Sequence, residues 1–281
     1  MPELPEVEIV CRGLIPVMEG AIINSLKTTR PNLRTPFPEN FSEKVKNSKI
    51  IKINRRAKYA QLILNNDLTI VIHLGMSGVI KIITPEEKYE NAKHDHMIIS
   101  LNNGYKIILN DPRRFGMVLL INSNEINEHK SFSSLGPEPF SNEFNGEYLY
   151  KELQKRTGKI KSALLDQSLI AGLGNIYVCE ALFDTSICPT RKSNSLTKED
   201  AENLVIASKE ILDRAIKAGG STLKDYRHVN GDLGYFQHQF KVYGKEGQKC
   251  PECNCDITKT NGIKRINQSG RSSFYCQNKQ K

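Results

Sequence analysis

The chain has 281 residues, with 40 lysine and arginine residues against 31 acidic ones, a formal net charge of +9 and an isoelectric point near 9.1. This positive balance favours a polyanionic partner. The sequence contains neither an apolar run of about 18 residues nor a secretory leader, so it predicts no contact with a membrane. We therefore expect a cytoplasmic protein, which is long enough for two domains with cores of their own.

The first predicted element is a helix near the N-terminus. Apolar residues from Val7 to Val17 recur at helical spacing, and Gly20 is the expected C-terminal cap. Pro5 and Glu6 suit the first turn of such a helix. A helix start does not, however, account for Pro2.

Strand patterns follow the helix. Residues 49–83 alternate apolar and polar side chains between turn signals, and MIISLNNGYKIIL has the Asn103-Gly104 tip of a β-hairpin. Residues 21 to about 125 are thus predicted to form an antiparallel β-sandwich. The stretch SFSSLGPEPFSNEFNG is rich in turn-forming residues and indicates a linker.

The second half of the chain is predicted to be helical. One helix is expected over 176–183 after the GLGN turn, and Thr197 with Asp200 forms a capping box for another that ends at Gly219-Gly220. The chain closes with a hairpin that carries a cluster of cysteines. Clustered cysteines in a cytoplasmic protein are typical of a metal site, and these are Cys250, Cys253, Cys255 and Cys276.

Pro2 suggests covalent chemistry. If Met1 is removed, Pro2 carries a secondary amine, which is far more often unprotonated near neutral pH than a lysine is. Attack by this amine on a sugar C1′ leads to an iminium, which acts as an electron sink for elimination, and Glu3 could give acid or base assistance. A proline at position 2 is, taken alone, more often a processing detail.

Three further stretches bear on this chemistry. RRAKYA and NDPRRFGM combine arginines and a lysine with aromatic residues at strands and turns, which suits contact with phosphates and insertion into a base stack. A solvated charged edge is the alternative for both. GLGN before a helix offers free backbone N–H groups to a phosphate, although glycines commonly only turn the chain.

Together these motifs resemble a known family. PELPEVE, RRAKYA, HLGMSG, NDPRRFG, GLGNIY and GRSSFYC occur in the order seen in formamidopyrimidine-DNA glycosylases, over essentially the whole chain. The resemblance implies an α+β, multidomain fold with DNA in the cleft between its domains. The expected parts are an N-terminal antiparallel β-sandwich with flanking helices (1–135), a linker (136–150), a helix-two-turns-helix domain (151–240) and a zinc-finger-type β-hairpin (241–281).

The resemblance also implies roles for individual residues. Pro2 would be the Schiff-base nucleophile and Glu3 the acid that assists opening of the sugar ring. Lys58 would donate a proton in β-elimination, and Arg271 would act in δ-elimination. The remaining assignments are void-filling side chains at Met76, Arg113 and Phe115, further DNA contacts at His94, Asn175 and Lys161, and lesion-pocket residues at Glu6, Ser221 and Arg227.

Some of these residues keep simpler interpretations. Met76 could be ordinary turn packing, His94 and His96 could be a surface pair, and Asn175 could cap its helix. Ser221 and Arg227 lie in the stretch GGSTLKDYRHVNGDLGYF, which the resemblance makes a loop over an everted base.

The C-terminal hairpin departs from the family pattern. The family has two CxxC pairs, whereas here the second pair reads Cys276-Gln-Asn-Lys279. Structural zinc normally has four ligands in a closed tetrahedron. We therefore expect either one weakly held zinc ion on Cys250, Cys253 and Cys276, with Cys255 as a substitute ligand, or a metal-free hairpin.

The sequence thus predicts a monomeric glycosylase and apurinic/apyrimidinic lyase that removes oxidised purines, 8-oxoguanine and formamidopyrimidines, from double-stranded DNA. One alternative is an endonuclease VIII-like enzyme for oxidised pyrimidines. Another, from a different class, is a non-catalytic binder of damaged DNA.

Overall fold

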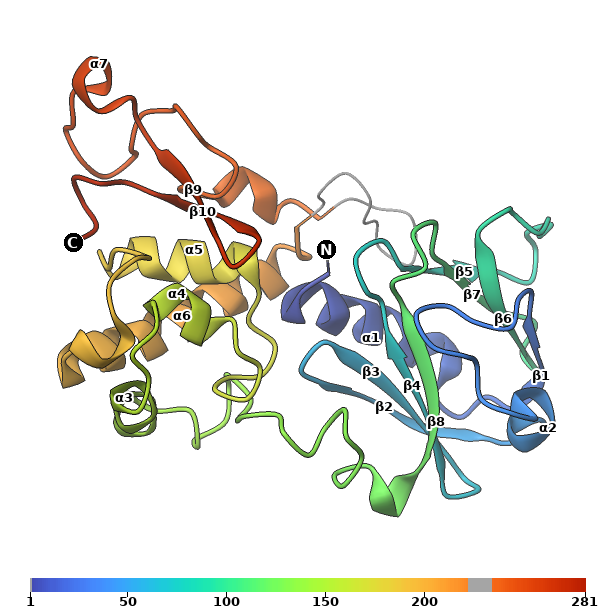
Figure 1. The fold of residues 1–281 in the computed structure, drawn as a ribbon. Helices are drawn as coiled ribbons and strands as arrows, with labels where there is room; N and C mark the ends of the chain where they lie inside the picture. The colour runs from blue at the N-terminus through green and yellow to red at the C-terminus, as the bar shows by residue number, and fades with distance from the viewer. Residues whose placement is uncertain (1, 222–233) are drawn as a thin grey trace. The chain divides into compact units, whose positions relative to one another are not determined.

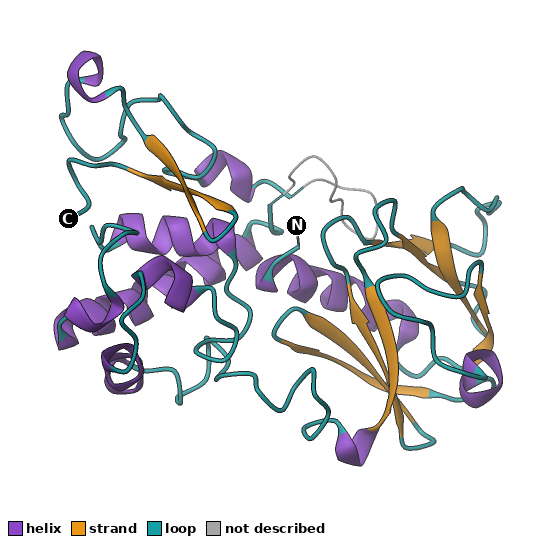
Figure 2. Ribbon diagram, in the orientation of Figure 1, coloured by secondary structure: helices purple, strands orange, loops and turns teal. Residues whose placement is uncertain are grey.

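The computed structural model describes residues 2–221 and 234–281 and divides into two compact units (Figure 1). Unit 1 comprises residues 1–133 and 216–237, and unit 2 comprises residues 134–215 and 238–281. Strands dominate unit 1, whereas helices dominate unit 2 (Figure 2). The finer division into four parts remains a prediction.

Unit 1 contains the predicted antiparallel sandwich. One sheet has the order β1-β6-β7-β5 and the other the order β2-β3-β4-β8. All paired neighbours within the two sheets are antiparallel. The elements are α1 (Leu4–Met18), β1 (Ile23–Thr28), α2 (Phe41–Val45), β2 (Ile50–Arg56), β3 (Tyr59–Leu64), β4 (Leu68–His73), β5 (Val79–Ile83), β6 (Asp95–Leu101), β7 (Lys106–Asn110), β8 (Met117–Asn122) and η1 (Ser123–Glu125).

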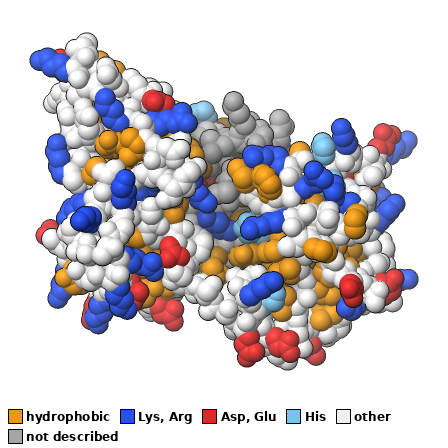
Figure 3. All heavy atoms as spheres, in the orientation of Figure 1, with side chains coloured by type: hydrophobic (Ala, Val, Ile, Leu, Met, Phe, Trp, Pro, Cys, Tyr) orange, Lys and Arg blue, Asp and Glu red, His pale blue; other side chains and the backbone are white. Residues whose placement is uncertain are grey.

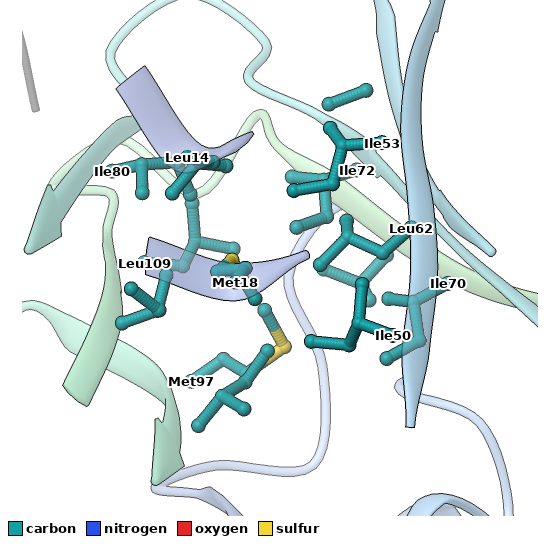
Figure 4. Packing of buried hydrophobic residues seen from close by; sticks show 14 of the residues in the cluster. Leu14, Met18, Ile50, Ile53, Leu62, Ile70, Ile72, Ile80, Met97 and Leu109 are labelled. Carbon is teal, nitrogen blue, oxygen red and sulfur yellow. The ribbon is translucent and has the colours of Figure 1, made fainter. Parts of the chain in front are cut away.

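The core of unit 1 joins α1 to both sheets. Leu14 and Met18 on the apolar face of α1 have no exposed surface, and they belong to the same cluster as side chains of both sheets (Figure 4). Burying one such aliphatic side chain contributes about 1.5–3 kcal/mol. This packing fixes α1, and with it the N-terminal residues, on the sandwich.

The sequence signals mark the ends of these elements, although the C-cap of α1 is Glu19 and not Gly20. Gly20 follows α1 at φ +83°, and its N–H donates to the Ile50 carbonyl at 2.8 Å. Gly104 lies at φ +88° in the turn between β6 and β7. Both positions require the left-handed backbone region that glycine adopts without steric cost.

Unit 2 begins at residue 134, and its first helix, α3, starts at Gly146 within the predicted linker (136–150) and continues to Gln154. The Asn145 side chain accepts the Tyr148 N–H at 2.9 Å, and Leu149 and Leu153 are buried, so this cap and apolar face favour a helix there. The elements that follow are α4 (Ile160–Leu164), α5 (Asn175–Asp184), η2 (Ser193–Ser195), α6 (Lys198–Lys217), η3 (Phe236–Gln239), α7 (Ile257–Thr260), β9 (Lys264–Gln268) and β10 (Arg271–Tyr275), after α3 (Gly146–Gln154).

The capping box of α6 and the C-terminal hairpin are also confirmed. The N–H of Thr197 donates to the Asp200 carboxylate at 3.0 Å, and the N–H of Asp200 donates to the Thr197 hydroxyl at 3.1 Å. Strands β9 and β10 pair antiparallel, with Arg271 opposite Gln268. Within residues 2–221 and 234–281, no helix is long and apolar enough to cross a membrane.

Candidate active site and cysteine cluster

The N-terminal residues are buried at the start of α1. Pro2 and Glu3 both lie inside unit 1, and Glu3 is 1% exposed. The backbone N–H of Glu3 donates to the Glu6 carboxylate at 2.9 Å. The positive end of the α1 dipole favours carboxylates at this position. Pro2 and the acid next to it in the chain are therefore both shielded from water at the start of α1.

Lys58 lies at the tip of the β2–β3 hairpin. Because Arg56 pairs with Tyr59, Ala57 and Lys58 form a two-residue turn, with Ala57 at φ +51°. Arg55 donates to Glu8 of α1 at 2.9 Å and to the Ala57 carbonyl at 3.1 Å. These bonds fasten the tip of the hairpin to the helix that follows Pro2.

His73 lies at the end of β4, close to this hairpin. Burial lowers the pKa of His73 to about 4, and the positive charges of Lys58 and Arg34 act in the same direction. Its Nδ1 accepts the N–H of Gly75 at 3.1 Å, as only an unprotonated nitrogen can. The imidazole is therefore neutral near pH 7.

Two neighbouring turns of unit 1 expose the predicted void-filling side chains. Met76 is 38% exposed and Phe115 is 42% exposed, so these turns hold two large apolar side chains at the surface. The Arg113 guanidinium lies 5.0 Å from the centre of the Phe115 ring. A Cβ added at Gly75 would lie 2.3 Å from the carbonyl carbon of Phe115, so the two turns are in close contact.

A buried carboxylate joins these two turns. Asp111 has no exposed surface, and it accepts the Ser77 hydroxyl at 2.5 Å and the Gly116 N–H at 2.7 Å. Ser77 also accepts the N–H of Arg113 at 3.1 Å. Asp111 therefore sets the positions of Met76 and Arg113 without being exposed itself. Sequence reasoning missed it, although an aspartate before proline in NDPRRFG is a turn signal.

The histidine pair is not a pair of surface residues. His96 is 4% exposed, and its Nε2 lies 3.1 Å from the Asp111 carbonyl, whereas His94 is half-buried. The two rings are 6.2 Å apart between centres. The alternative of a surface pair is therefore wrong for His96, because the ring packs beneath the turn that carries Arg113.

Glu6 and Ser221 are in direct contact. The Glu6 carboxylate accepts the N–H and the hydroxyl of Ser221, each at 2.8 Å. Gly220 approaches the same carboxylate, since a Cβ added there would lie 3.3 Å from its Oε1. Two of the three predicted lesion-pocket residues thus meet at the start of α1. The third, Arg227, lies outside the described residues.

In unit 2, two side chains hold the strand that carries Arg271. The Lys161 ammonium and the Asn175 amide each donate to the Ser272 carbonyl at 3.0 Å. Lys161 has no exposed surface, so this ammonium lies inside unit 2. Gly174, and not Asn175, is the N-cap of α5, so the capping interpretation of Asn175 is wrong. The DNA contacts expected of Lys161 and Asn175 remain predictions.

Another buried acid, missed at the sequence level, anchors the start of the C-terminal segment. Glu180 on α5 is 1% exposed and accepts the backbone N–H groups of Lys241, Val242 and Tyr243 at 2.7, 2.9 and 2.7 Å. Burial raises the pKa of Glu180 despite these three hydrogen bonds, which act in the opposite direction. The signal in the sequence was an acid within the apolar run NIYVCEALF.

The predicted metal ligands come together in part. The sulfur atoms of Cys250, Cys253 and Cys276 all lie within 4.8 Å of one another, and Cys255 is buried in the same cluster. Three sulfur atoms at this separation suit a thiophilic metal ion. Lys279 does not join them, because its ammonium lies 2.8 Å from the Glu252 carboxylate.

Both units match models of one class of DNA-repair protein. Residues 1–118 match the formamidopyrimidine-DNA glycosylase N-terminal domain, and residues 135–227 match the H2TH domain of formamidopyrimidine-DNA glycosylase. The fold and site therefore define a DNA glycosylase with a helix-two-turns-helix domain.

Full-length relatives identify the family. The chain is 47% identical to the formamidopyrimidine-DNA glycosylase of Ruegeria pomeroyi over 98% of both chains, and 44% identical to that of Rhodospirillum rubrum over 100% of both. It belongs to the formamidopyrimidine-DNA glycosylase family.

Solved structures agree with this assignment. The MutM (Fpg) protein of Thermus thermophilus is 34% identical with a TM-score of 0.87, covering 99% of this chain and 98% of the other. Wild-type Lactococcus lactis Fpg (MutM), in complex with DNA containing N7-benzyl-Fapy-dG, is 35% identical with a TM-score of 0.89 over 99% of both chains.

Proposed function

We propose that this protein is a bifunctional DNA glycosylase and apurinic/apyrimidinic lyase that removes oxidised purines, 8-oxoguanine and formamidopyrimidines, in the cytoplasm. The observation that carries the proposal is the burial of Pro2 and Glu3 at the start of α1. Removal of Met1 would turn the Pro2 nitrogen from an amide into a secondary amine. Such an amine has a pKa of about 8, so much of it is nucleophilic near neutral pH.

The proposed reaction uses Pro2, Glu3, Lys58 and Arg271 one after another. The Pro2 nitrogen attacks C1′, the C1′–base bond breaks, and the base leaves with its bonding electrons while Glu3 assists opening of the sugar ring. The resulting iminium withdraws electrons, so that loss of a C2′ proton expels the 3′ phosphate. Lys58, at the tip of the hairpin fastened to α1, supplies a proton to this β-elimination, and Arg271 acts in the following δ-elimination.

Access to C1′ requires the damaged nucleotide to leave the base stack, at a cost of about a few kcal/mol. The exposed side chains of Met76, Arg113 and Phe115 are suited to filling the gap. Lysines and arginines are distributed over the face of each unit drawn in Figure 3, in keeping with the net charge of +9. Such charge supplies most of the affinity for a DNA backbone.

We also propose that Cys250, Cys253 and Cys276 hold one zinc ion, with Cys255 or water as the fourth ligand. Their sulfur atoms are close enough, but Lys279 cannot complete the site as the family's cysteine does. Zinc bound there would have a structural role. We expect mild chelation to remove it, and Lys279→Cys to raise its retention; retention of one zinc per chain after treatment with a strong chelator would refute a weak site.

Borohydride trapping tests the catalytic proposal. With an 8-oxoguanine:cytosine duplex, the protein without Met1 should form a reduced covalent adduct and nick the strand. A form that retains Met1 should bind the duplex and form no adduct, because the Pro2 nitrogen is then an amide. Equal trapping by both forms would refute the role of Pro2.

Two controls separate the alternatives. A thymine-glycol duplex processed in preference to 8-oxoguanine would favour an endonuclease VIII-like specificity. Tight binding of both duplexes without any adduct would favour a non-catalytic binder. Glu3→Gln should bind DNA and release the base poorly, since the acid is lost while the shape of the side chain is kept.

A further inference from the structure

The further inference concerns the finger segment, residues 241–281, and how it is attached to the helices of unit 2. In a zinc finger with four cysteines, the metal connects the first CxxC pair to the second. Here the first pair forms the knuckle, residues 250–253, whereas the second position of the other pair is Lys279. Residue 279 therefore cannot serve as a cysteine ligand, and the connection between the two ends of the finger must come from another contact.

An ion pair occupies that connection. Glu252, inside the knuckle, accepts from the Lys279 ammonium at 2.8 Å. The Lys279 side chain is 17% exposed, and its ammonium lies 5.0 Å from the centre of the buried Phe183 ring of α5. A cation that is packed on an aromatic ring and partly shielded from water keeps more of its electrostatic attraction than a solvated one.

The same carboxylate is part of a longer network. Lys241 lies 2.6 Å from Glu252 and 2.8 Å from Asp184, and Asp184 also accepts from Arg214 of α6 at 3.2 Å. The Lys241 ammonium lies 6.0 Å from the Phe183 ring, so the ring has contact with two ammonium groups. The network therefore joins the knuckle to α5 and α6.

The other parts of the finger segment have attachments of their own. Gln280 is 2% exposed; its side chain accepts the Cys276 N–H at 2.8 Å and donates to the Ile187 carbonyl at 2.9 Å. Lys161 and Asn175 hold β10 through the Ser272 carbonyl. None of these bonds involves a cysteine sulfur, so they hold the tail and β10 independently of any metal.

We propose that the Glu252–Lys279 ion pair, with Lys241, does the work of the missing fourth cysteine: it fastens the knuckle to α5 and α6 and keeps the finger segment folded when no metal is bound. A four-cysteine finger depends on its metal to connect its two ends. In this finger the ion pair between Glu252 and Lys279 makes that connection. The proposal concerns attachment alone and holds whether or not Arg271 acts in catalysis.

Hydrogen exchange of the full-length protein, before and after treatment with a strong chelator, tests the proposal. In the metal-free protein, the amides of residues 245–256 should stay protected at low salt. Raising salt to about 0.5 M should accelerate their exchange only slightly, because a partly buried pair 2.8 Å apart is screened much less than a solvated one. Peptides from β2 and β3 in unit 1 serve as the internal reference. An unprotected knuckle in the metal-free protein at low salt would overturn the proposal.

Variants isolate the charge. Lys279→Met keeps the apolar stem on Phe183 and should accelerate knuckle exchange about fivefold in the metal-free protein, with little further effect of salt. Lys279→Arg keeps the positive charge, so the knuckle amides should stay protected. Lys259→Met, on α7 of the same segment, is the matched control and should change nothing, since that lysine is 84% exposed.

Two further variants distinguish an ion pair from simple packing. Glu252→Gln removes the negative charge of the ion pair, and its knuckle amides should exchange as fast as those of Lys279→Met. In Lys279→Cys the knuckle amides should be protected from exchange only when zinc is present, as in a four-cysteine finger. The proposal is wrong if Lys279→Met exchanges as slowly as the unaltered protein.

Discussion

At the scale of single residues, Arg113 is the side chain best placed to read the base opposite the lesion. It is exposed on the turn between β7 and β8, and its guanidinium stacks 5.0 Å from the Phe115 ring. We expect Arg113→Ala to reduce the preference for cytosine over adenine opposite 8-oxoguanine by about tenfold, because one bidentate contact to a base is worth about 1–3 kcal/mol. Single-turnover excision on the two duplexes measures this ratio.

The neighbouring arginine supplies the control. Arg114 is also exposed but lies at φ +60°, so Arg114→Asn removes its charge while asparagine tolerates that backbone region. This variant should weaken binding to both duplexes equally and leave the ratio of excision opposite cytosine to excision opposite adenine unchanged. If Arg113→Ala reduced excision equally on the cytosine and adenine duplexes, Arg113 would have no role in reading the opposite base.

His73 makes stability depend on pH. The unfolded chain binds a proton on this residue near pH 6.5 but the folded protein does so near pH 4, so between these values the unfolded state binds more protons and stability falls as the pH falls. At pH 5 the loss is about 2 kcal/mol. His73→Asn keeps an acceptor for the Gly75 N–H and should remove this part of the acid sensitivity. Urea unfolding at pH 7.5 and pH 5 measures the difference, and an unchanged difference would exclude His73 as its source.

At the scale of elements, the close contact between two turns of unit 1 can be tested with a pair of glycines. Gly75 and Gly20 both have positive φ, but only at Gly75 would a Cβ meet backbone atoms, at 2.3 Å from Phe115; at Gly20 nothing lies within 4 Å. Gly20→Ala should cost about 1–2 kcal/mol for the left-handed backbone alone. Gly75→Ala should cost about 1–3 kcal/mol more, because the turns must separate.

Urea denaturation of the two glycine variants measures these costs, and excision activity gives a second measure. Gly20→Ala should keep its activity, whereas Gly75→Ala should lose it, since the turns that carry Met76 and Phe115 would no longer be in close contact. Equal stability of the two variants would mean that the turns move apart freely.

The elements themselves could be predicted from the sequence, because their signals are local. The period of the apolar residues in α1, the Asn103-Gly104 turn and the box at Thr197 each specify a structure within a few residues. The buried acids could not be assigned in this way. Asp111 accepts the Ser77 hydroxyl and Glu180 accepts the backbone N–H of Val242, and only the tertiary fold brings those remote groups to them.

The same reasoning separates the predicted catalytic residues from the altered cysteine cluster. Pro2, Glu3 and Lys58 were predictable because the resemblance lies in contiguous motifs. The consequence of Lys279 was not, since its partner Glu252 is remote in the sequence and the pattern showed only that a cysteine was missing.

At the scale of the whole molecule, the number of phosphates that its positive side chains neutralise should determine how DNA binding responds to salt. Each phosphate that the protein neutralises releases counterions, so the logarithm of the binding constant should fall linearly with the logarithm of salt concentration, by about 0.9 per phosphate. Arg271→Ala should reduce this slope by about one if Arg271 contacts a phosphate. Titration of an abasic-site duplex at several salt concentrations measures the slope.

The control for charge alone is Lys44→Ala on α2, an exposed lysine outside the candidate site. Both variants lower the net charge equally, so a slope set by total charge would change equally in the two. A slope set by contacts should fall with Arg271→Ala and stay constant with Lys44→Ala, because a charge more than about a Debye length from the DNA is screened. Equal slopes for both variants would therefore assign the salt response to the overall field of the protein and remove Arg271 from the set of phosphate contacts.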